Sequence, residues 1–177
     1  MNNITLLSIV ILLGVVIIIS YIPVVRSQIK NNNLWFGIDG SARNYFYFCM
    51  LLSVVGFGLF FIPLFKNIDT ESYQENQIGL FKNKNVLPAL LITLLLSSFL
   101  WSFFILHAEK KLFAVLSSFS LVLTALCTIL LIAGTVEVKS MDTTTTIMMV
   151  GLVLFSITTV LNDGIIYNAK MLKKIFK

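Results

Sequence analysis

Trp101 is the side chain whose type and surroundings point most directly to a binding site. Thr93, Ser97 and Trp101 follow one another at intervals of four residues, and Ser98 and Ser102 form a second row beside them. In a helix each row lies on one face, so an indole ring stands among hydroxyl groups. An indole can stack on a flat molecule, and its N–H needs a hydrogen-bond partner in apolar surroundings. The pattern is compatible with binding of an uncharged lipophilic molecule between helices and with close packing of the indole in the core.

Hydroxyl rows of this kind also have a purely structural explanation. Close-packed helices in a membrane place small and polar residues at their interfaces, where Ser and Thr bond across helices or back to a backbone carbonyl. One narrow helical face in the run 112–136 carries four such residues, Ser117, Ser120, Thr124 and Thr128. The sequence leaves both interpretations open: packed interfaces, or a cavity that is apolar with a few polar groups.

Asp163 and Asn162 are polar residues at the far end of the last apolar run. Ionisable side chains at membrane depth are rare and often functional. Asp163 also precedes Lys170 by seven residues, so an interfacial ion pair is the alternative interpretation. We treat Asp163, together with Ser97, as a secondary candidate for ligand contact.

Catalytic and metal chemistry find little support in the sequence. His107 is the one histidine, and Cys49 and Cys127 lie in apolar runs without the paired spacing of a thiolate site. These counts exclude a zinc site of several His and Cys ligands, and haem held by two histidines, within this chain. No Gly-rich phosphate loop, nucleophile elbow or HExxH motif occurs. We predict that the protein is not an enzyme and uses no metal or cofactor.

Composition places these residues in a membrane. Of the 177 residues, 58% are hydrophobic and 12% are charged, and the mean hydropathy is +0.94. A soluble chain carries about 25% charged residues, and a small soluble domain cannot hide this much apolar surface. Five apolar runs can each cross about 30 Å of hydrocarbon as a helix: residues 4–25, 45–65, 86–106, 112–136 and 144–166. The sequence thus predicts an all-α integral membrane protein, a single bundle of five transmembrane helices.

The basic residues predict how this bundle is oriented. Nine Lys and Arg residues lie on the side that holds the C-terminal tail, and four lie on the other side. The positive-inside rule then places the N-terminus outside and the C-terminus in the cytoplasm. The net charge of +5 is explained by this asymmetry and by anionic lipid headgroups. We therefore expect the lipid bilayer, and no nucleic acid, as a partner.

Three stretches resemble the TspO/translocator protein family, also called tryptophan-rich sensory proteins or peripheral benzodiazepine receptors. Residues 97–116 are similar to its third helix, short turn and start of the fourth, with Trp101 at a motif Trp and Ser98 where Asn is usual. Residues 158–168 are similar to its Thr-x-Leu-Asn ending of the fifth helix, with Asn162 at the motif Asn. Trp35 in LWFG matches the Trp before the second helix. The chain departs from the family in having only two Trp.

The resemblance implies a function as well as a fold. It implies a central cavity for porphyrins, sterols or similar flat apolar molecules, a lid formed by residues 26–44, and a homodimer. On this hypothesis the ligand contacts are Trp35, Ser98, Trp101 and Asn162, with Ser97 and Asp163 as secondary candidates. The alternative is an accessory subunit of a larger membrane complex, whose polar stripes contact partner subunits and which holds no ligand.

Overall fold

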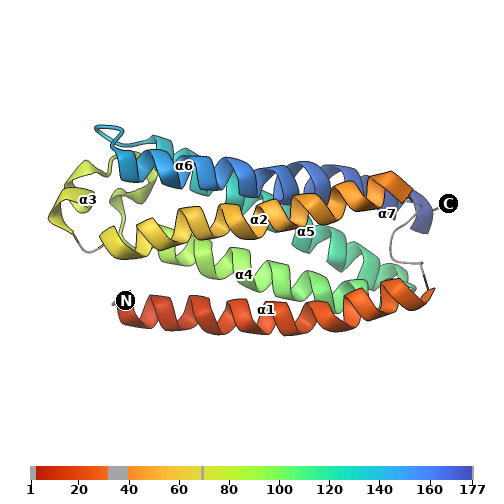
Figure 1. Ribbon diagram of the computed structural model, residues 1–177. Coiled ribbons are helices and arrows are strands. Elements are labelled where there is room, and N and C mark those ends of the chain that lie inside the picture. The colour runs from red at the N-terminus through yellow and green to blue at the C-terminus, as the bar shows by residue number, and fades with distance from the viewer. Residues whose placement is uncertain (1–2, 32–39, 69, 177) are drawn as a thin grey trace.

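The computed structural model describes residues 3–31, 40–68 and 70–176, and most of them are helical (Figure 1). In chain order the elements are α1 (Asn3–Asn31), α2 (Gly40–Asn67), α3 (Glu71–Asn76), η2 (Gly79–Lys82), α4 (Val86–Ile105), α5 (Lys111–Val136), α6 (Thr143–Ser156), η3 (Ile157–Tyr167) and α7 (Asn168–Ile175). Extended pairing in the described residues is limited to one isolated bridge, between Gln77 and Val138.

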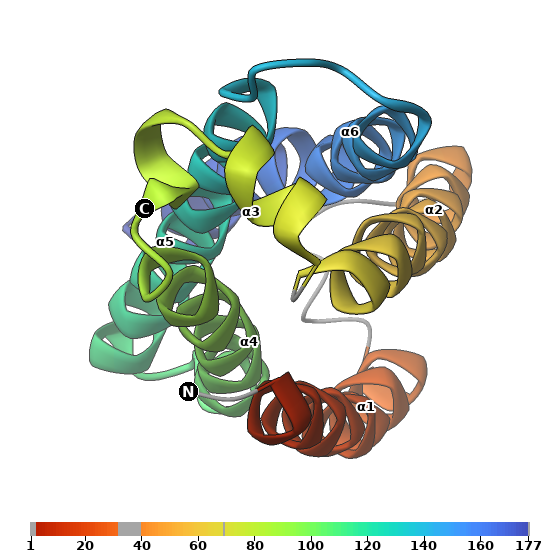
Figure 2. The same cartoon turned by 90° about the vertical axis from the view of Figure 1, so that its left-hand side faces the viewer.

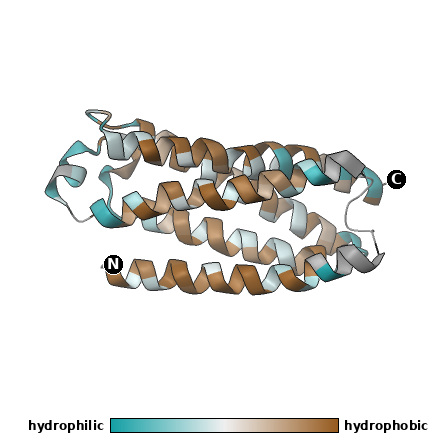
Figure 3. Cartoon of the chain, in the orientation of Figure 1, coloured by the Kyte–Doolittle hydropathy of each residue, from teal (hydrophilic) through white to brown (hydrophobic). Residues whose placement is uncertain are grey.

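Five helical stretches are long and apolar enough to cross a membrane, Ile4–Val24, Asn44–Asn67, Val86–Ile105, Lys111–Val136 and Thr143–Ile175. They confirm the five helices predicted from the apolar runs. Figure 3 shows apolar residues along the middle of the bundle and polar residues toward its two ends. Because a helix satisfies its own backbone polar groups, this arrangement suits a hydrocarbon layer. The fold is compatible with a multi-pass membrane bundle.

The connections on either side of α2, residues 26–44 and 66–85, are partly helical. α1 continues to residue 31 and α2 begins at residue 40, so both ends of the predicted lid, residues 26–44, belong to helices. The centre of that segment, residues 32–39, lies outside the described residues. The second long connection holds α3 and η2. Polar side chains mark where a helix leaves hydrocarbon, but Gln, Lys and Arg are good helix formers and do not end its hydrogen-bond ladder.

The helices pack in an order that differs from their order in the chain. α1 packs mainly on α4, α4 on α5, α5 on α6 and η3, and α2 on α6 and η3. The short turn after α4 makes α4 and α5 antiparallel neighbours, as predicted (Figure 1). Viewed along the bundle, α1 and α2 are the two ends of this packing order (Figure 2). α1 therefore depends on one neighbour for most of its packing.

α2 and α6 cross closely at a pair of glycines. A Cβ atom added to Gly56 would lie 2.6 Å from the Gly151 carbonyl oxygen, and one added to Gly151 would lie 2.6 Å from the Gly56 carbonyl oxygen. The two backbones are thus in direct contact, with no room for a side chain between them. Small residues permit this approach in membrane proteins, where close van der Waals packing drives helix association.

The connections that follow α2 and α5 are hydrogen-bonded to each other at one end of the bundle. The Asn76 amide donates to the Ser140 carbonyl oxygen at 2.8 Å and accepts from the Ser140 N–H at 2.8 Å. The Glu137 carboxylate accepts from the Leu80 N–H at 2.7 Å. Burial in this region raises the pKa of the Tyr73 phenol. α3 and η2 are therefore tied to the α5–α6 connection by specific contacts.

The last membrane-length helix changes its hydrogen-bonding pattern part-way along. α6 and α7 are α-helical, whereas η3 between them is π-helical. At the end of η3 the Asn168 N–H donates to the Asp163 carbonyl oxygen five residues earlier, which is the π-helical spacing. Such segments are rare and frequently mark functional sites. Gly164, whose absent Cβ would lie 3.0 Å from the Ala125 Cβ, lets η3 lie against α5.

Candidate functional site

A cavity of about 430 Å³ lies between α1, α2, α4, α5 and the last membrane-length helix. Its volume is in the range of pockets that hold drug-sized molecules. The wall is mostly aliphatic and aromatic with a few polar groups, which is the usual make-up of a small-molecule site. Apart from Tyr and Trp, the polar residues of the wall are Ser53, Ser98, Thr124, Thr158, Thr159 and Asp163.

The cavity opens sideways between α1 and α2. Ile18 on α1 and Val54 on α2 both line it, yet they are 69% and 71% exposed at the surface of the bundle. On the opposite wall Leu94 and Trp101 line it from α4 and are buried. Because Ile18 and Val54 stand near the middle of their helices, the mouth would face the surrounding hydrocarbon in a membrane.

Trp101 stands in the wall between two tyrosines. Its ring centroid is 5.3 Å from that of Tyr21 on α1 and 6.2 Å from that of Tyr167 on η3. Trp101 is only 8% exposed, and its Nε1 atom has no hydrogen-bond partner among the described residues. A buried donor left without an acceptor costs about 1–3 kcal/mol. An acceptor atom on a bound molecule would remove that cost.

Ser98 and Ser97 are neighbours on α4 with different surroundings. Ser98 lines the cavity, and its hydroxyl donates to the Leu94 carbonyl oxygen at 2.9 Å, so its lone pairs remain able to accept. Ser97 lies outside the described wall, and its hydroxyl pairs with that of Thr124 on α5 at 2.7 Å. Ser98 therefore fits the interpretation of a ligand contact, and Ser97 fits that of a packed interface.

Other hydroxyl pairs join the helices around the cavity. Ser102 on α4 donates to Ser20 on α1 at 2.7 Å. Thr159 on η3 donates to Thr128 on α5 at 3.1 Å, and Thr159 also lines the cavity. Both interpretations of the hydroxyl rows thus apply, because the same rows bond neighbouring helices and contribute polar atoms to the wall.

Asn162 is buried beside the cavity rather than in its described wall. It is 0% exposed, and neither amide atom has a hydrogen-bond partner in the described part of the chain. A role for Asn162 in ligand contact stays a prediction, and it would require η3 to turn this side chain toward the cavity.

Asp163, the next residue, lines the cavity. Tyr21 of α1 and Tyr167 of η3 line it together with Asp163. Lys170, its alternative partner from the sequence, is exposed on α7. The described wall of the cavity, which Asp163 lines, includes no lysine. The structure thus turns this carboxyl group toward the cavity and not toward the basic tail.

Tyr21 and Tyr167 are two of the wall residues that sequence reasoning missed. Tyr21 stands near the end of an apolar run, where Tyr commonly anchors a helix at the membrane surface, but it lines the cavity instead. The available signal was spacing, because Thr159, Asp163 and Tyr167 recur every four residues and all line the cavity. Trp35 lies outside the described residues, so its contact with a ligand stays a prediction.

Groupings suited to metal binding do not occur in the part of the chain that the structure describes. His107 is exposed at the end of α4, where its Nδ1 atom lies 3.0 Å from the Phe103 carbonyl oxygen. Cys49 and Cys127 are buried and free. What the cavity offers chemically is aromatic stacking, a few hydrogen-bonding groups and the one carboxyl group of Asp163.

Comparisons with protein-family models, with curated proteins and with solved structures give no match. The resemblance to the TspO/translocator protein family therefore rests on the three stretches quoted above and stays a prediction.

Proposed function

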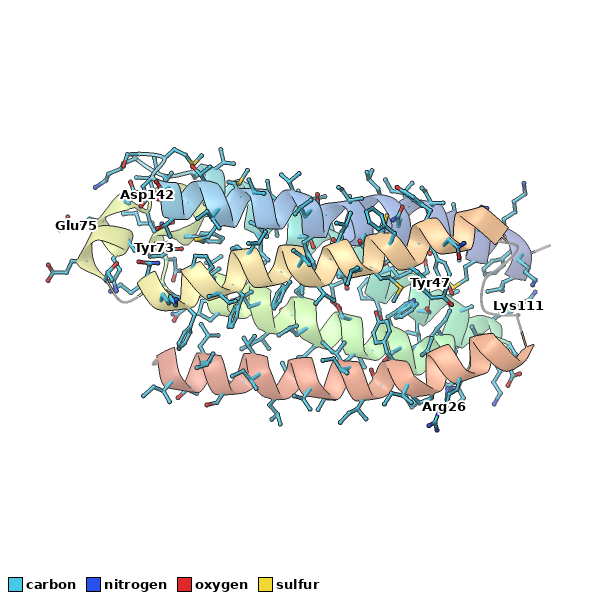
Figure 4. The ribbon with its side chains drawn as sticks, viewed as in Figure 1. Arg26, Tyr47, Tyr73, Glu75, Lys111 and Asp142 are labelled. Atoms are coloured by element: carbon cyan, nitrogen blue, oxygen red, sulfur yellow. The ribbon has the colours of Figure 1, made fainter. Side chains whose placement is uncertain are left out.

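We propose that the bundle spans a membrane with its N-terminus outside and its C-terminus in the cytoplasm. Figure 4 shows Glu75 and Asp142 at the end that carries α3, and Arg26 and Lys111 at the opposite end. In the sequence, nine of the 13 basic residues fall in the connections and tail of that second end. The positive-inside rule supports this orientation, because basic connections are retained on the cytoplasmic side.

The function we propose is the binding, or the carriage across the bilayer, of a flat lipophilic molecule of porphyrin-like or sterol-like shape. The observation that carries the proposal is the position of Trp101. Its indole is buried in the wall of a cavity of about 430 Å³, with an N–H group that lacks an acceptor among the described residues. A flat ligand with one acceptor atom would stack on the ring and complete that hydrogen bond.

The sideways mouth supports access from the bilayer rather than from water. The exposed wall residues, Ile18 and Val54, are apolar and belong to α1 and α2. A lipophilic molecule dissolves in hydrocarbon and would reach them without crossing a polar surface. α1 packs mainly on α4, so a small movement of α1 would widen the mouth while the contacts among the other four helices are kept.

A titration of the protein in phosphatidylcholine nanodiscs tests this function. The probes are protoporphyrin IX and a fluorescent sterol, and the readouts are tryptophan emission and the thermal midpoint of unfolding. We expect saturable quenching and a higher midpoint, because a ligand that binds only the folded state stabilises it. Unchanged emission and an unchanged midpoint with both probes at saturation would refute the proposal.

A pair of glycine variants separates binding in the cavity from binding elsewhere. Gly14 lines the cavity, whereas Gly58 lies outside its described wall; a Cβ added at either position would meet no atom within 4 Å. Gly14→Phe therefore fills the cavity without a clash at its first atom, and Gly58→Phe adds the same side chain elsewhere. We expect Gly14→Phe to abolish quenching and Gly58→Phe to leave it unchanged.

The accessory-subunit hypothesis has one structural observation in its favour. α1 packs mainly on α4, and it exposes residues such as Ile11 and Ile18, at 54% and 69%. A helix of another subunit could cover this face and close the mouth. Purification in a mild detergent distinguishes the two functions: unrelated chains in a fixed ratio support the subunit, and a monomer or homodimer that binds the probes supports the binding protein.

A further inference from the structure

One part of the cavity wall brings a carboxyl group and three aromatic rings together. Asp163 precedes Tyr167 by four residues on η3, and both line the cavity together with Tyr21 of α1. Both tyrosine rings contact the indole of Trp101 on α4, at centroid distances of 5.3 and 6.2 Å. All four residues line the cavity. We refer to these four residues as the carboxyl–aromatic group.

The described wall supplies no positive charge to this carboxyl group. The lining residues include no Lys, Arg or His, and the nearest basic residues in sequence, Lys170 and Lys173, are exposed on α7. A carboxylate removed from water without a partner is strongly disfavoured, and an opposite charge that also donates a hydrogen bond offsets that penalty. An ionised Asp163 therefore needs a positive complement from outside the described residues, and protonation of the carboxyl group is the other way to offset its burial.

The three rings favour the same kind of complement. An aromatic face carries negative electrostatic potential and attracts a cation within about 6 Å of its centroid, most strongly where water is excluded. Carboxylate and aromatic faces together recognise alkylammonium groups, since the carboxylate accepts from N–H while the rings contact the methylene carbons that share the positive charge.

Resting on the proposed function, we propose that the molecule bound in the cavity is a lipophilic amine whose protonated nitrogen is held by the carboxyl–aromatic group. The ammonium N–H donates to the Asp163 carboxylate, and the rings of Tyr21, Trp101 and Tyr167 surround its carbon substituents. The apolar body of the molecule lies against the aliphatic remainder of the wall. This assigns a charge to the ligand, which the general function of binding a flat lipophilic molecule does not require.

Two probes of nearly equal shape test the proposal on the unaltered chain. 1-Pyrenemethylamine carries an ammonium group at neutral pH, whereas 1-pyrenemethanol is neutral. Binding is measured in nanodiscs of zwitterionic phosphatidylcholine as energy transfer from tryptophan to pyrene, with partition into protein-free nanodiscs subtracted. We expect the amine to bind about tenfold more tightly than the alcohol, as a desolvated cation–aromatic and carboxylate contact predicts.

A matched pair of substitutions locates the preference. Asp163→Asn removes the charge at the carboxyl–aromatic group, and Asp142→Asn removes one carboxylate at the start of α6, away from the cavity. We expect Asp163→Asn to lower amine affinity about tenfold while binding of the alcohol is retained. Asp142→Asn is expected to leave both affinities unchanged. Gel filtration and the thermal midpoint establish that each variant is folded.

Each outcome bears on a different proposal. Equal affinities of the two probes for the unaltered chain would overturn the lipophilic-amine ligand and leave the proposed function standing. The same follows if the amine is preferred but Asp163→Asn retains the preference. Absence of transfer with either probe would overturn both proposals. Because the comparison of probes needs no variant, a failure of Asp163→Asn to fold does not remove the test.

Discussion

Replacing Gly56 by alanine is expected to force α2 and α6 apart. The new Cβ atom would lie 2.6 Å from the Gly151 carbonyl oxygen and 2.7 Å from the Phe155 backbone nitrogen. Ordinary van der Waals contact begins near 3.4 Å, so the two helices must separate by about 0.8 Å, or tilt, to admit one methyl group. Both obstructing atoms belong to the backbone, and no flexible side chain can yield instead.

The cost follows from the kind of contact that is lost. Overpacking a well-packed site costs about 1–3 kcal/mol, and a rigid backbone obstacle places Gly56→Ala in the upper part of that range, at about 2–3 kcal/mol. Separation of α2 from α6 also weakens every van der Waals contact along the crossing, which in lipid is a main source of helix association. The substitution would otherwise stabilise the helix slightly, since alanine has a higher helix propensity than glycine.

Unfolding by dodecyl sulfate in mixed micelles, followed by circular dichroism, measures this effect. Gly58→Ala is the matched control, because Gly58 is on the same helix and a Cβ there would meet no atom within 4 Å. Both variants gain the same helix propensity, so the difference between them isolates the crossing. If Gly56→Ala and Gly58→Ala unfold at the same midpoint, the backbones of α2 and α6 do not lie in close contact at Gly56.

Two further predictions concern the connections at the α3 end. Asp142 caps α6 by accepting from the Thr145 N–H at 2.7 Å, and this bond holds its pKa below the ordinary value. Asp142→Ala should destabilise the protein by about 1 kcal/mol. The capping hydrogen bond is present above about pH 4 and should weaken as the pH falls through the pKa of Asp142 in the folded protein. Midpoints of unfolding measured against pH would show this weakening. Asn76→Ala removes both bonds to the Ser140 backbone and should speed proteolysis after α2, whereas Asn76→Asp should do so less.

The five helices were predictable because the apolar runs are long and almost free of charge. The residues at which these helices begin and end were less predictable. The polar residues after residue 25 indicate where α1 leaves hydrocarbon, yet the helix continues to residue 31. Composition reports the boundary between lipid and water, whereas the end of a helix depends on capping and on chain entropy, which a run of Gln, Lys and Arg leaves undecided.

The candidate site was predictable in part, for reasons that differ from residue to residue. Ser98 and Trp101 line the cavity, because helical spacing on the regular α4 fixes their direction. Asn162 lies outside the described wall; it was named from the resemblance to a motif Asn, whereas the four-residue spacing of Thr159, Asp163 and Tyr167 marks the face of η3 that lines the cavity. Tyr21 has the sequence position of an anchor at the membrane surface, and nothing in the sequence indicated that it lines the cavity.

The packing order gives a physical reason for a cavity at this place. α2 is fixed to α6 by the contact between Gly56 and Gly151, and α4 is fixed to α5 by the hydroxyl pair of Ser97 and Thr124. These contacts build a wall of four helices whose spacing does not depend on α1. α1 then covers the wall from α4, held there by packing and by the Ser20–Ser102 hydrogen bond. A cavity therefore remains where α1 and α2 do not pack closely against each other. Its mouth can widen by displacement of α1, which has the weakest packing in the bundle.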